Sequence, residues 1–270
     1  MTPESGGCKG SFKVGRLFVE YVKPKADEKL HDEPILFVHG AFSGSWCWHT
    51  FMDYFSERGW DCYAMNWRGH HKSDRVPDHE FVKISVLDYV EDVEEVAAKV
   101  GETLIIVGHS LGGLVSQKYA ERHETAGIIL IAPGPPAQVG SPSESTVSTG
   151  KPIKIFSREK TKWRYFYKIS DEDFERYYSL MCPESPTALN ERWTNKIGVD
   201  KSKVSHPILV VNAEFDFRHA KVDRNTADYY SADYLYIRGH GHEMFIEEGW
   251  EKIAEKIQHW LLKHFPESRA

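Results

Sequence analysis

The chain has 270 residues, 41% of them hydrophobic, which is enough for one large domain, or for one domain with a substantial insertion. Its formal net charge of −6 at pH 7 gives no long-range attraction to nucleic acid or to an anionic membrane surface, so we expect neither as a partner. The four cysteines lack C-x-x-C spacing, which indicates reduced, packed thiols and not a disulfide framework or a zinc site.

The first ten residues, MTPESGGCKG, contain neither the basic region nor the apolar region of a secretory signal peptide. An uninterrupted apolar run of about 18 residues, as a membrane span needs, is also missing from the sequence. We therefore expect a soluble, cytoplasmic protein, and nothing in the sequence points to a particular oligomeric state.

Apolar runs rich in β-formers alternate with helical patterns along most of the chain, which is typical of a mostly parallel sheet covered by helices on both faces. Strands are expected at about 12–22 (a hairpin), 34–38, 61–66, 103–108, 127–132, 207–212 and 233–238. Helices are expected at about 46–57, 84–99, 111–123, 217–230 and 245–264. The predicted fold class is α/β, with a doubly wound sheet of about eight strands.

The alternation stops once, between Pro133 and His206. This stretch opens with the Gly/Pro/Ser-rich segment GPPAQVGSPSESTVSTG and then becomes charged and aromatic. We interpret residues 134–206 as an inserted cap, and residues 1–133 together with 207–270 as the core.

One part of this predicted cap, residues 151–168, has seven basic residues and one acidic residue in the sequence KPIKIFSREKTKWRYFYK. Such a run fits either an anionic substrate or an interface. We favour a simpler interpretation, a solvated helix whose aromatic side chains turn inward.

The motif G-x-S-x-G occurs at residues 108–112, GHSLG, where an apolar strand runs into a helical pattern. In this motif the serine occupies a strained strand-to-helix turn that holds its hydroxyl out of the sheet, and the flanking glycines let strand and helix approach. Ser110 is therefore a candidate nucleophile. The alternative is that Ser110 only caps the helix that follows it.

A serine hydroxyl needs a base to take its proton, and the base needs an acid to orient it. The last two expected strands each end in a loop with suitable residues: NAEFD at 212–216 and RGHGHEM at 238–244. Two carboxylates compete for the acid role, Asp216 and Glu214. We choose Asp216 on reach, and we expect Glu214 to be a solvated turn residue or a partner of Arg218.

Five segments together resemble the α/β-hydrolase fold family: HGAFSGSWCW (39–48), NWRGHHKSD (66–74), GHSLGG (108–113), NAEFD (212–216) and GHGHEMF (239–245). The resemblance implies that Ser110 is the nucleophile, His242 the general base and Asp216 the residue that orients it. It also implies an oxyanion hole made by the backbone N–H groups of Ala41 and Leu111, with Phe42 as a further candidate donor.

The segment NWRGHHKSD departs from the family pattern D-x-R-G-x-G-x-S, because Asn66 replaces the Asp and His71 replaces the second Gly. We expect this loop to affect the shape of the site and not its chemistry. The histidines outside the predicted triad do not fall in a metal-binding spacing, so we expect no metal and no cofactor; they are His39, His70, His71, His109 and His240.

An activated serine beside an oxyanion hole points to acyl transfer, so we expect a carboxylesterase-like serine hydrolase that cleaves a small, largely apolar ester or lactone through an acyl-enzyme intermediate. Fold and triad do not fix the reaction. The alternatives are a lyase of the hydroxynitrile type, another non-hydrolytic enzyme of this fold, or a small-molecule receptor that retains the triad. Four side chains are expected to contact the substrate: Phe42, His109, Trp163 and Phe166.

Overall fold

The computed structural model describes residues 7–101, 103–144, 146–205, 207–217 and 220–268. Within them one sheet has eight strands: β1 (Cys8–Val14), β2 (Leu17–Lys23), β3 (Ile35–Val38), β4 (Cys62–Met65), β5 (Ile105–His109), β6 (Gly127–Ile131), β7 (Ile208–Ala213) and β8 (Asp233–Ile237). Their order in the sheet is β1-β2-β4-β3-β5-β6-β7-β8. The pairs β1–β2 and β2–β4 are antiparallel and all others are parallel. The predicted α/β fold is confirmed.

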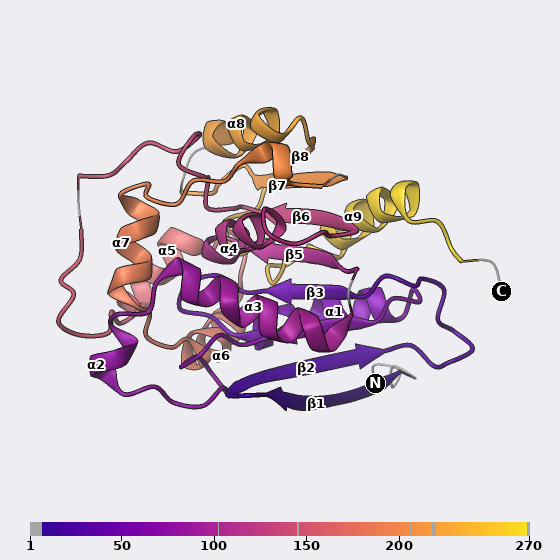
Figure 1. Cartoon of the computed structure of the whole chain (residues 1–270), viewed down its shortest axis with the longest axis horizontal. Helices are drawn as coiled ribbons and strands as arrows, with labels where there is room; N and C mark the ends of the chain where they lie inside the picture. The colour runs from indigo at the N-terminus through magenta and orange to yellow at the C-terminus, as the bar shows by residue number, and fades with distance from the viewer. Residues whose placement is uncertain (1–6, 102, 145, 206, 218–219, 269–270) are drawn as a thin grey trace.

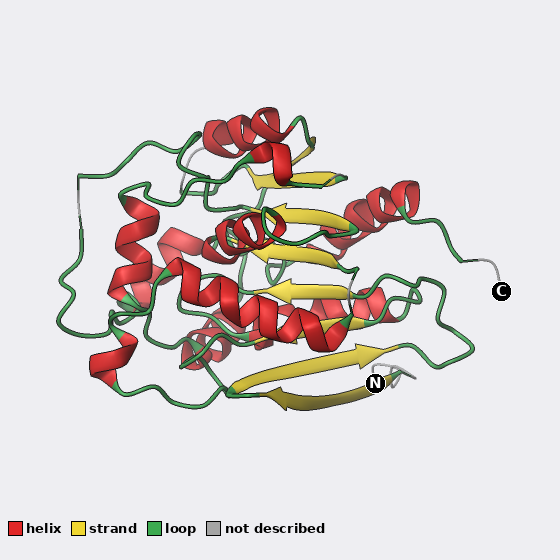
Figure 2. Ribbon diagram, viewed as in Figure 1, coloured by secondary structure: helices red, strands yellow, loops and turns green. Residues whose placement is uncertain are grey.

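The two faces of this sheet are covered by the helices α1 (His49–Ser56), α3 (Val86–Val100), α4 (Leu111–Ala120), α8 (Ala220–Tyr230) and α9 (Trp250–His264). In Figure 1, α3 and α4 lie in front of the sheet, while α1 and α9 lie behind it. Figure 2 shows the same alternation of strands and helices by colour. The predicted helical coverage of both faces is therefore present.

The central strands are buried on both faces because their alternate side chains enter two different cores. In β3, Phe37 packs with the core under α1 and α9, whereas its neighbour Leu36 packs with the core under α3 and α4. In β5, Val107 packs with the core under α1 and α9, and Ile106 packs with the core under α3 and α4. This pattern explains why these strands read as continuous apolar runs in the sequence.

Helix ends differ from the expected ones where local backbone geometry intervenes. The helix expected from residue 245 begins at Trp250, because Gly249 has a left-handed φ of +91° directly before it. The helix expected at 46–57 is divided into a 3₁₀ turn at Ser45–Trp48 and α1. A short helix, α2 (Asp78–Phe81), was not expected.

We call residues 134–206 the insert segment. Its described residues form the α-helices α5 (Arg158–Tyr165), α6 (Asp171–Leu180) and α7 (Pro186–Trp193), and a 3₁₀ turn at Lys201–Lys203. These helices lie at the end of the molecule where the parallel strands finish (Figure 1). A short bridge between Ile153 and Glu184 ties two distant parts of the segment together. The division of the chain into core and cap stays a prediction.

The aromatic side chains of the insert segment do not all turn inward, contrary to expectation. Phe166 and Phe174 are buried and pack edge to face, with ring centroids 5.7 Å apart. Trp163, by contrast, is 79% exposed, and Tyr167 is also exposed. Only some of the aromatic side chains of this segment are therefore buried in a hydrophobic core.

Helices that could cross a bilayer, judged by length and apolarity together, are absent from the described residues.

Candidate active site

Ser110 lies between β5 and α4 with a strained backbone, φ 51° and ψ −117°. A left-handed φ is unfavourable for a residue with a side chain, and here it is held by hydrogen bonds on both sides of the turn. The Ser110 N–H donates to Ile131 O over 3.2 Å, and its carbonyl accepts from Gly134 N over 2.6 Å. Within the described residues the Ser110 side chain makes no capping hydrogen bond to α4, so the alternative role as a helix cap is not observed.

The glycines of the motif are required by close packing around this turn. A Cβ at Gly108 would lie 2.6 Å from Gly112 O, and one at Gly112 would lie 2.6 Å from Val38 O. Both distances are shorter than any Cβ contact that a folded chain tolerates without movement. The strand before Ser110, the helix after it and the end of β3 can therefore approach only because these two positions lack side chains.

His242 and Asp216 come from the loops that follow β8 and β7, and the structure brings them together. His242 Nδ1 donates to Asp216 Oδ2 over 2.9 Å, and both side chains are buried. The imidazole of His242 also packs against the rings of Phe217 and His109, with centroid distances of 4.9 and 4.6 Å. A hydrogen bond to Nδ1 fixes the tautomer whose Nε2 can accept a proton.

Glu214, the competing carboxylate, is exposed to solvent. Its Oε2 accepts from the N–H of Gly239 over 2.9 Å, which ties together the loops after β7 and β8. This matches the solvated turn residue that the sequence analysis expected. Its other suggested partner, Arg218, lies outside the described residues.

The predicted oxyanion donors lie on the loop after β3 and at the start of α4, and both residues line the pocket. Ala41 follows β3, and Leu111 is the first residue of α4, where no carbonyl of the same helix can accept its N–H. The inclusion of Phe42 as a donor was wrong, because its N–H donates to the buried carboxylate of Glu184 over 3.3 Å. The side chain of Phe42 does line the pocket, as expected.

Glu184, from the insert segment, was missed by the sequence analysis because a lone Glu before a helix carries no motif. Its carboxylate is fully buried and receives four donors. Oε2 accepts from Phe42 N over 3.3 Å and from His70 Nε2 over 3.2 Å. Oε1 accepts from Tyr89 OH over 2.6 Å and from Ser185 N over 2.7 Å.

The insert segment thus holds the loop after β3 on both sides of Phe42. Glu184 accepts the N–H of Phe42, and Cys182 N donates to the carbonyl oxygen of Phe42 over 3.0 Å. Burial disfavours the charged form of His70, but the attraction of the Glu184 carboxylate and their hydrogen bond outweigh it and raise the pKa of His70 above its ordinary value. Glu184 therefore favours the charged form of His70 relative to a free imidazole.

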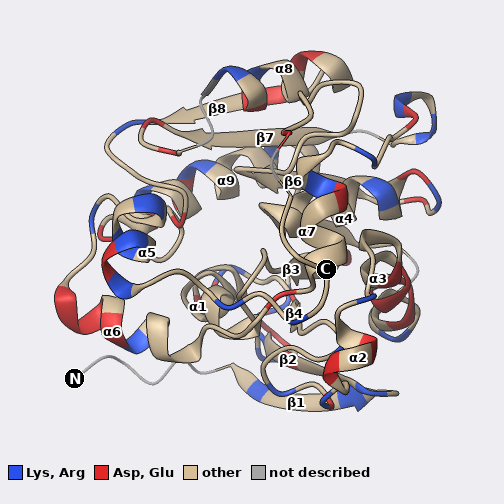
Figure 3. Cartoon of the chain, turned by 90° about the vertical axis from the view of Figure 1, so that its left-hand side faces the viewer, with Lys and Arg blue, Asp and Glu red and all other residues tan. Residues whose placement is uncertain are grey.

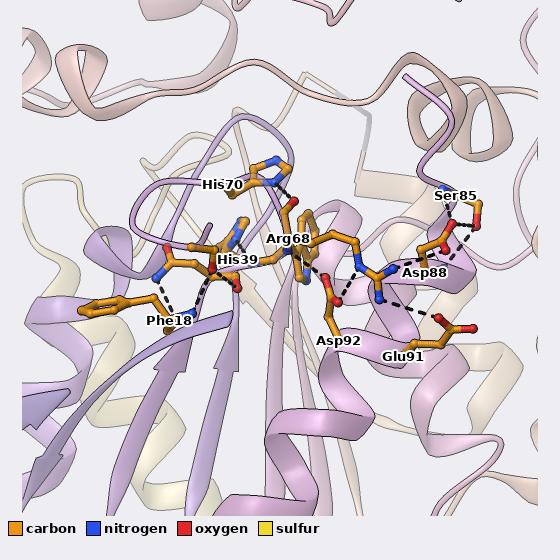
Figure 4. Close-up of polar contacts among 11 residues, drawn as sticks. Phe18, His39, Arg68, His70, Ser85, Asp88, Glu91 and Asp92 are labelled. Carbon is orange, nitrogen blue, oxygen red and sulfur yellow. Dashed lines mark hydrogen bonds and ion pairs between the residues drawn. The ribbon is translucent and has the colours of Figure 1, made fainter. Parts of the chain in front are cut away.

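The loop at residues 66–74 is fixed by contacts of its own. Asn66 Oδ1 accepts from Ser45 N over 2.8 Å, so the Asn that departs from the family pattern supports the turn that begins at Ser45. Arg68 is turned toward α3, where its Nε donates to Asp92 Oδ1 over 2.6 Å (Figure 4). Burial raises the pKa of Asp92 to about 6, although Arg68 beside it acts in the opposite direction. These contacts agree with a role in shape, as expected.

Ser110 and His242 line one pocket of about 190 Å³, whose walls come from both the core and the insert segment. Of the four side chains expected to contact a substrate, Phe42 and His109 line this pocket. Trp163 does not, because it points to solvent, and Phe166 does not, because it is buried against Phe174. The pocket walls that the sequence analysis missed are Ser43, Ile155, Phe156, Arg164, Tyr165, Met181, Leu189, Arg192, Trp193, Phe217 and Glu243.

The donor atoms of His109, His242 and Glu243 lie within 4.8 Å of one another, and this is the group of described residues that could hold a metal ion. Two residues of this group already make hydrogen bonds through their ring nitrogens. Nδ1 of His242 is bound to Asp216, and His109 Nε2 donates to the backbone carbonyl of His242 over 3.2 Å. The arrangement is better suited to orient the imidazole of His242 than to ligate a cation.

Comparison with known families and structures agrees with this geometry. A model of the alpha/beta hydrolase fold matches residues 33–268. The chain therefore belongs to the α/β-hydrolase fold family.

Two curated relatives match part of the chain. A non-heme haloperoxidase from Rhodococcus erythropolis is 31% identical over 132 residues, 46% of this chain and 44% of the relative. A rice protein, from Oryza sativa subsp. indica, bears the name "Probable esterase PIR7A" and is 34% identical over 108 residues, 38% of this chain and 39% of the relative. The chain thus spans less than half the length of these relatives.

Among solved structures, a monoacylglycerol lipase from Paleococcus ferrophilus has a TM-score of 0.72 to this chain, with 19% identity over 92% of this chain and 99% of the lipase. A thermophilic esterase from Thermogutta terrifontis has a TM-score of 0.71, with 17% identity over 95% of this chain and 99% of the esterase. At such identities the likeness establishes the shared fold alone.

Proposed function

We propose that this protein is a serine hydrolase that cleaves a small carboxylic ester or lactone through an acyl-enzyme intermediate. The observation that carries the proposal is the 2.9 Å hydrogen bond to Asp216 from His242, which lines the same pocket as Ser110. Esterase and lipase relatives support the same reaction class.

In the proposed mechanism the Ser110 hydroxyl attacks the ester carbonyl while Nε2 of His242 takes its proton. Asp216 keeps Nδ1 protonated and stabilises the imidazolium that forms. The negative charge on the tetrahedral carbonyl oxygen is stabilised by the N–H groups of Ala41 and Leu111. The imidazolium then gives its proton to the leaving alkoxide, and water hydrolyses the acyl-enzyme by the same steps in reverse.

The pocket restricts the substrate by size and by surface. At about 190 Å³ it is smaller than the range of about 300–1,000 Å³ that drug-sized ligands occupy. Its walls include Phe42, Tyr165 and Phe217. These features support a compact acyl group that packs against aromatic rings.

The first experiment measures hydrolysis of p-nitrophenyl acetate by wild type, Ser110→Ala and Ser116→Ala. The Ser110 variant should lose about 10³-fold or more in kcat, because the nucleophile is one part of a single proton-transfer unit. Ser116→Ala is the control, since it removes a buried hydroxyl from α4, the helix that follows Ser110, outside the pocket wall. A phosphonate ester label should modify Ser110 in wild type, as read by peptide mass spectrometry.

Cyanohydrin cleavage, measured on mandelonitrile beside the ester, tests the lyase alternative. A protein that cleaves the cyanohydrin faster than any ester, or that hydrolyses esters equally well without the Ser110 hydroxyl, would contradict the proposal.

A further inference from the structure

Arg164, at the last turn of α5, brings a positive charge into the wall of the pocket that Ser110 and His242 line. Arg192 of α7 adds a second cation to this wall, and Glu243 adds one carboxylate. Figure 3 looks onto this end of the molecule and shows the basic residues of α5 as blue bands on its ribbon. The pocket therefore combines an aromatic surface with an excess of cationic side chains.

Two other basic side chains of α5 have acidic partners among the described residues, whereas Arg164 has none there. Arg158 pairs with Glu175 over 2.9 Å, and Lys162 pairs with Asp171. In the described part of the chain, no carboxylate lies within 4.0 Å of the Arg164 guanidinium. Its Nε is buried and finds no hydrogen-bond acceptor among these residues.

Aromatic rings hold the Arg164 guanidinium in place. Its Cζ lies 3.9 Å from the ring centroid of Phe217, with Phe156 and Tyr165 at 5.6 and 5.9 Å. Such stacking fixes the orientation of the planar group but leaves its N–H donors unused, because a ring face accepts no strong hydrogen bond in the guanidinium plane. A buried donor without an acceptor costs free energy that a bound acceptor would recover.

We propose that the substrate of this site carries a carboxylate, which Arg164 binds while the ester group lies at Ser110. This inference rests on the proposed function and deepens it, because it names the substrate class. Guanidinium and carboxylate match in shape and charge, and their hydrogen bonds are among the strongest that side chains make. The substrate is then a compact half-ester or a comparable small ester with one free carboxylate, and the aromatic walls contact its hydrocarbon part.

The test compares two methyl esters that differ in charge but little in shape. Monomethyl succinate has a terminal carboxylate, which methyl 4-methylpentanoate replaces with an isopropyl group. Wild type should show a kcat/KM about 10- to 100-fold higher for the anionic ester, the range expected for a hydrogen bond to a charged group. Arg164→Gln should abolish this preference by lowering kcat/KM for the anionic ester about 10- to 100-fold.

Two further variants keep the result interpretable. Arg158→Gln removes an exposed charge from the same helix and should retain the preference for the anion. Arg164→Lys keeps the charge but not the planar donor set, and should have an intermediate preference even if Arg164→Gln does not fold. Circular dichroism reports the folding of each.

Hydrolysis of the neutral ester at least as fast as the anionic one by wild type, with no effect of Arg164→Gln, would overturn this inference and leave the proposed function standing. If wild type hydrolyses no ester at all, the proposed function fails, and calorimetric titration with monomethyl succinate still decides the anion site. Saturable binding that Arg164→Gln abolishes would support the site, and equal or absent binding in both proteins would refute it.

Discussion

Replacement of Glu184 by Gln should lower kcat about 10- to 100-fold, although Glu184 lies outside the pocket wall, because its carboxylate holds the loop that carries Ala41. All four groups around this carboxylate are donors, two at each oxygen. An amide has one oxygen and one NH₂ group, so two of the four donors lose their acceptor whichever way the substituted side chain is turned.

One of the two orientations of the amide disturbs the loop after β3 directly. If the amide oxygen faces Tyr89 and Ser185, the NH₂ group faces His70 and Phe42. His70 can adapt, because its Nδ1 lies 3.3 Å from Arg68 O and can carry the single proton of a neutral ring, which leaves Nε2 to accept from the amide. The backbone N–H of Phe42 can only donate, so the NH₂ group leaves it without an acceptor. One unsatisfied buried donor costs about 1–3 kcal/mol, and the simplest relief is movement of the loop.

The assay follows kcat and KM for p-nitrophenyl acetate together with the unfolding free energy in urea. Tyr89→Phe is the matched control, because it removes a donor from the other oxygen of Glu184 and leaves Phe42 N–H bound. It should cost about 1 kcal/mol of stability, with kcat within about threefold of wild type. Glu184→Gln should lower kcat with KM changed less than about threefold, as expected when stabilisation is lost only in the transition state. Equal kcat values for the two variants would refute the reasoning.

Two further predictions concern the acid of the triad and the charge of His70. Asp216→Asn should lower kcat on the order of 10⁴-fold, whereas Glu214→Gln should lower it less than about tenfold; the reverse order in steady-state assays would move the acid role to Glu214. The raised pKa of His70 means that its charged form stabilises the folded state fully below its ordinary pKa of 6.5, and that this contribution is lost as the pH rises through the higher folded-state value. Urea unfolding of wild type should therefore show a decline in stability above pH 6.5 that Glu184→Gln lacks, and parallel pH curves for the two proteins would contradict this.

The sheet and the predicted nucleophile turn could be read from the sequence because their causes are local. Strand β5 is a continuous apolar run, and Gly108 and Gly112 mark a turn that only small residues permit. The placement of Asp216 and His242 followed from topology. Parallel strands end at one edge of a sheet, so residues just after β7 and β8 meet there.

The pocket wall could not be predicted in the same way, because it depends on how the insert segment folds over the core. Along α5, Trp163 and Arg164 are neighbours in sequence, yet the first points to solvent and the second enters the pocket. A helix rotated by one residue, or about 100°, would exchange these roles, and the short α5 has no apolar stripe strong enough to fix its rotation from sequence alone.

Glu184 shows why buried polar residues escape sequence reasoning even when they are well placed. A Glu is expected at the surface, and only the three-dimensional arrangement reveals that donors from four separate positions converge on it. A carboxylate buried at this depth is tolerated because each of its oxygens accepts two hydrogen bonds. Since one of those donors is the backbone of Phe42, directly after Ala41, the insert segment and the proposed oxyanion hole form one connected unit. Divergence of the insert segment would therefore change not only which substrate fits the pocket but also how firmly the loop that carries Ala41 is held.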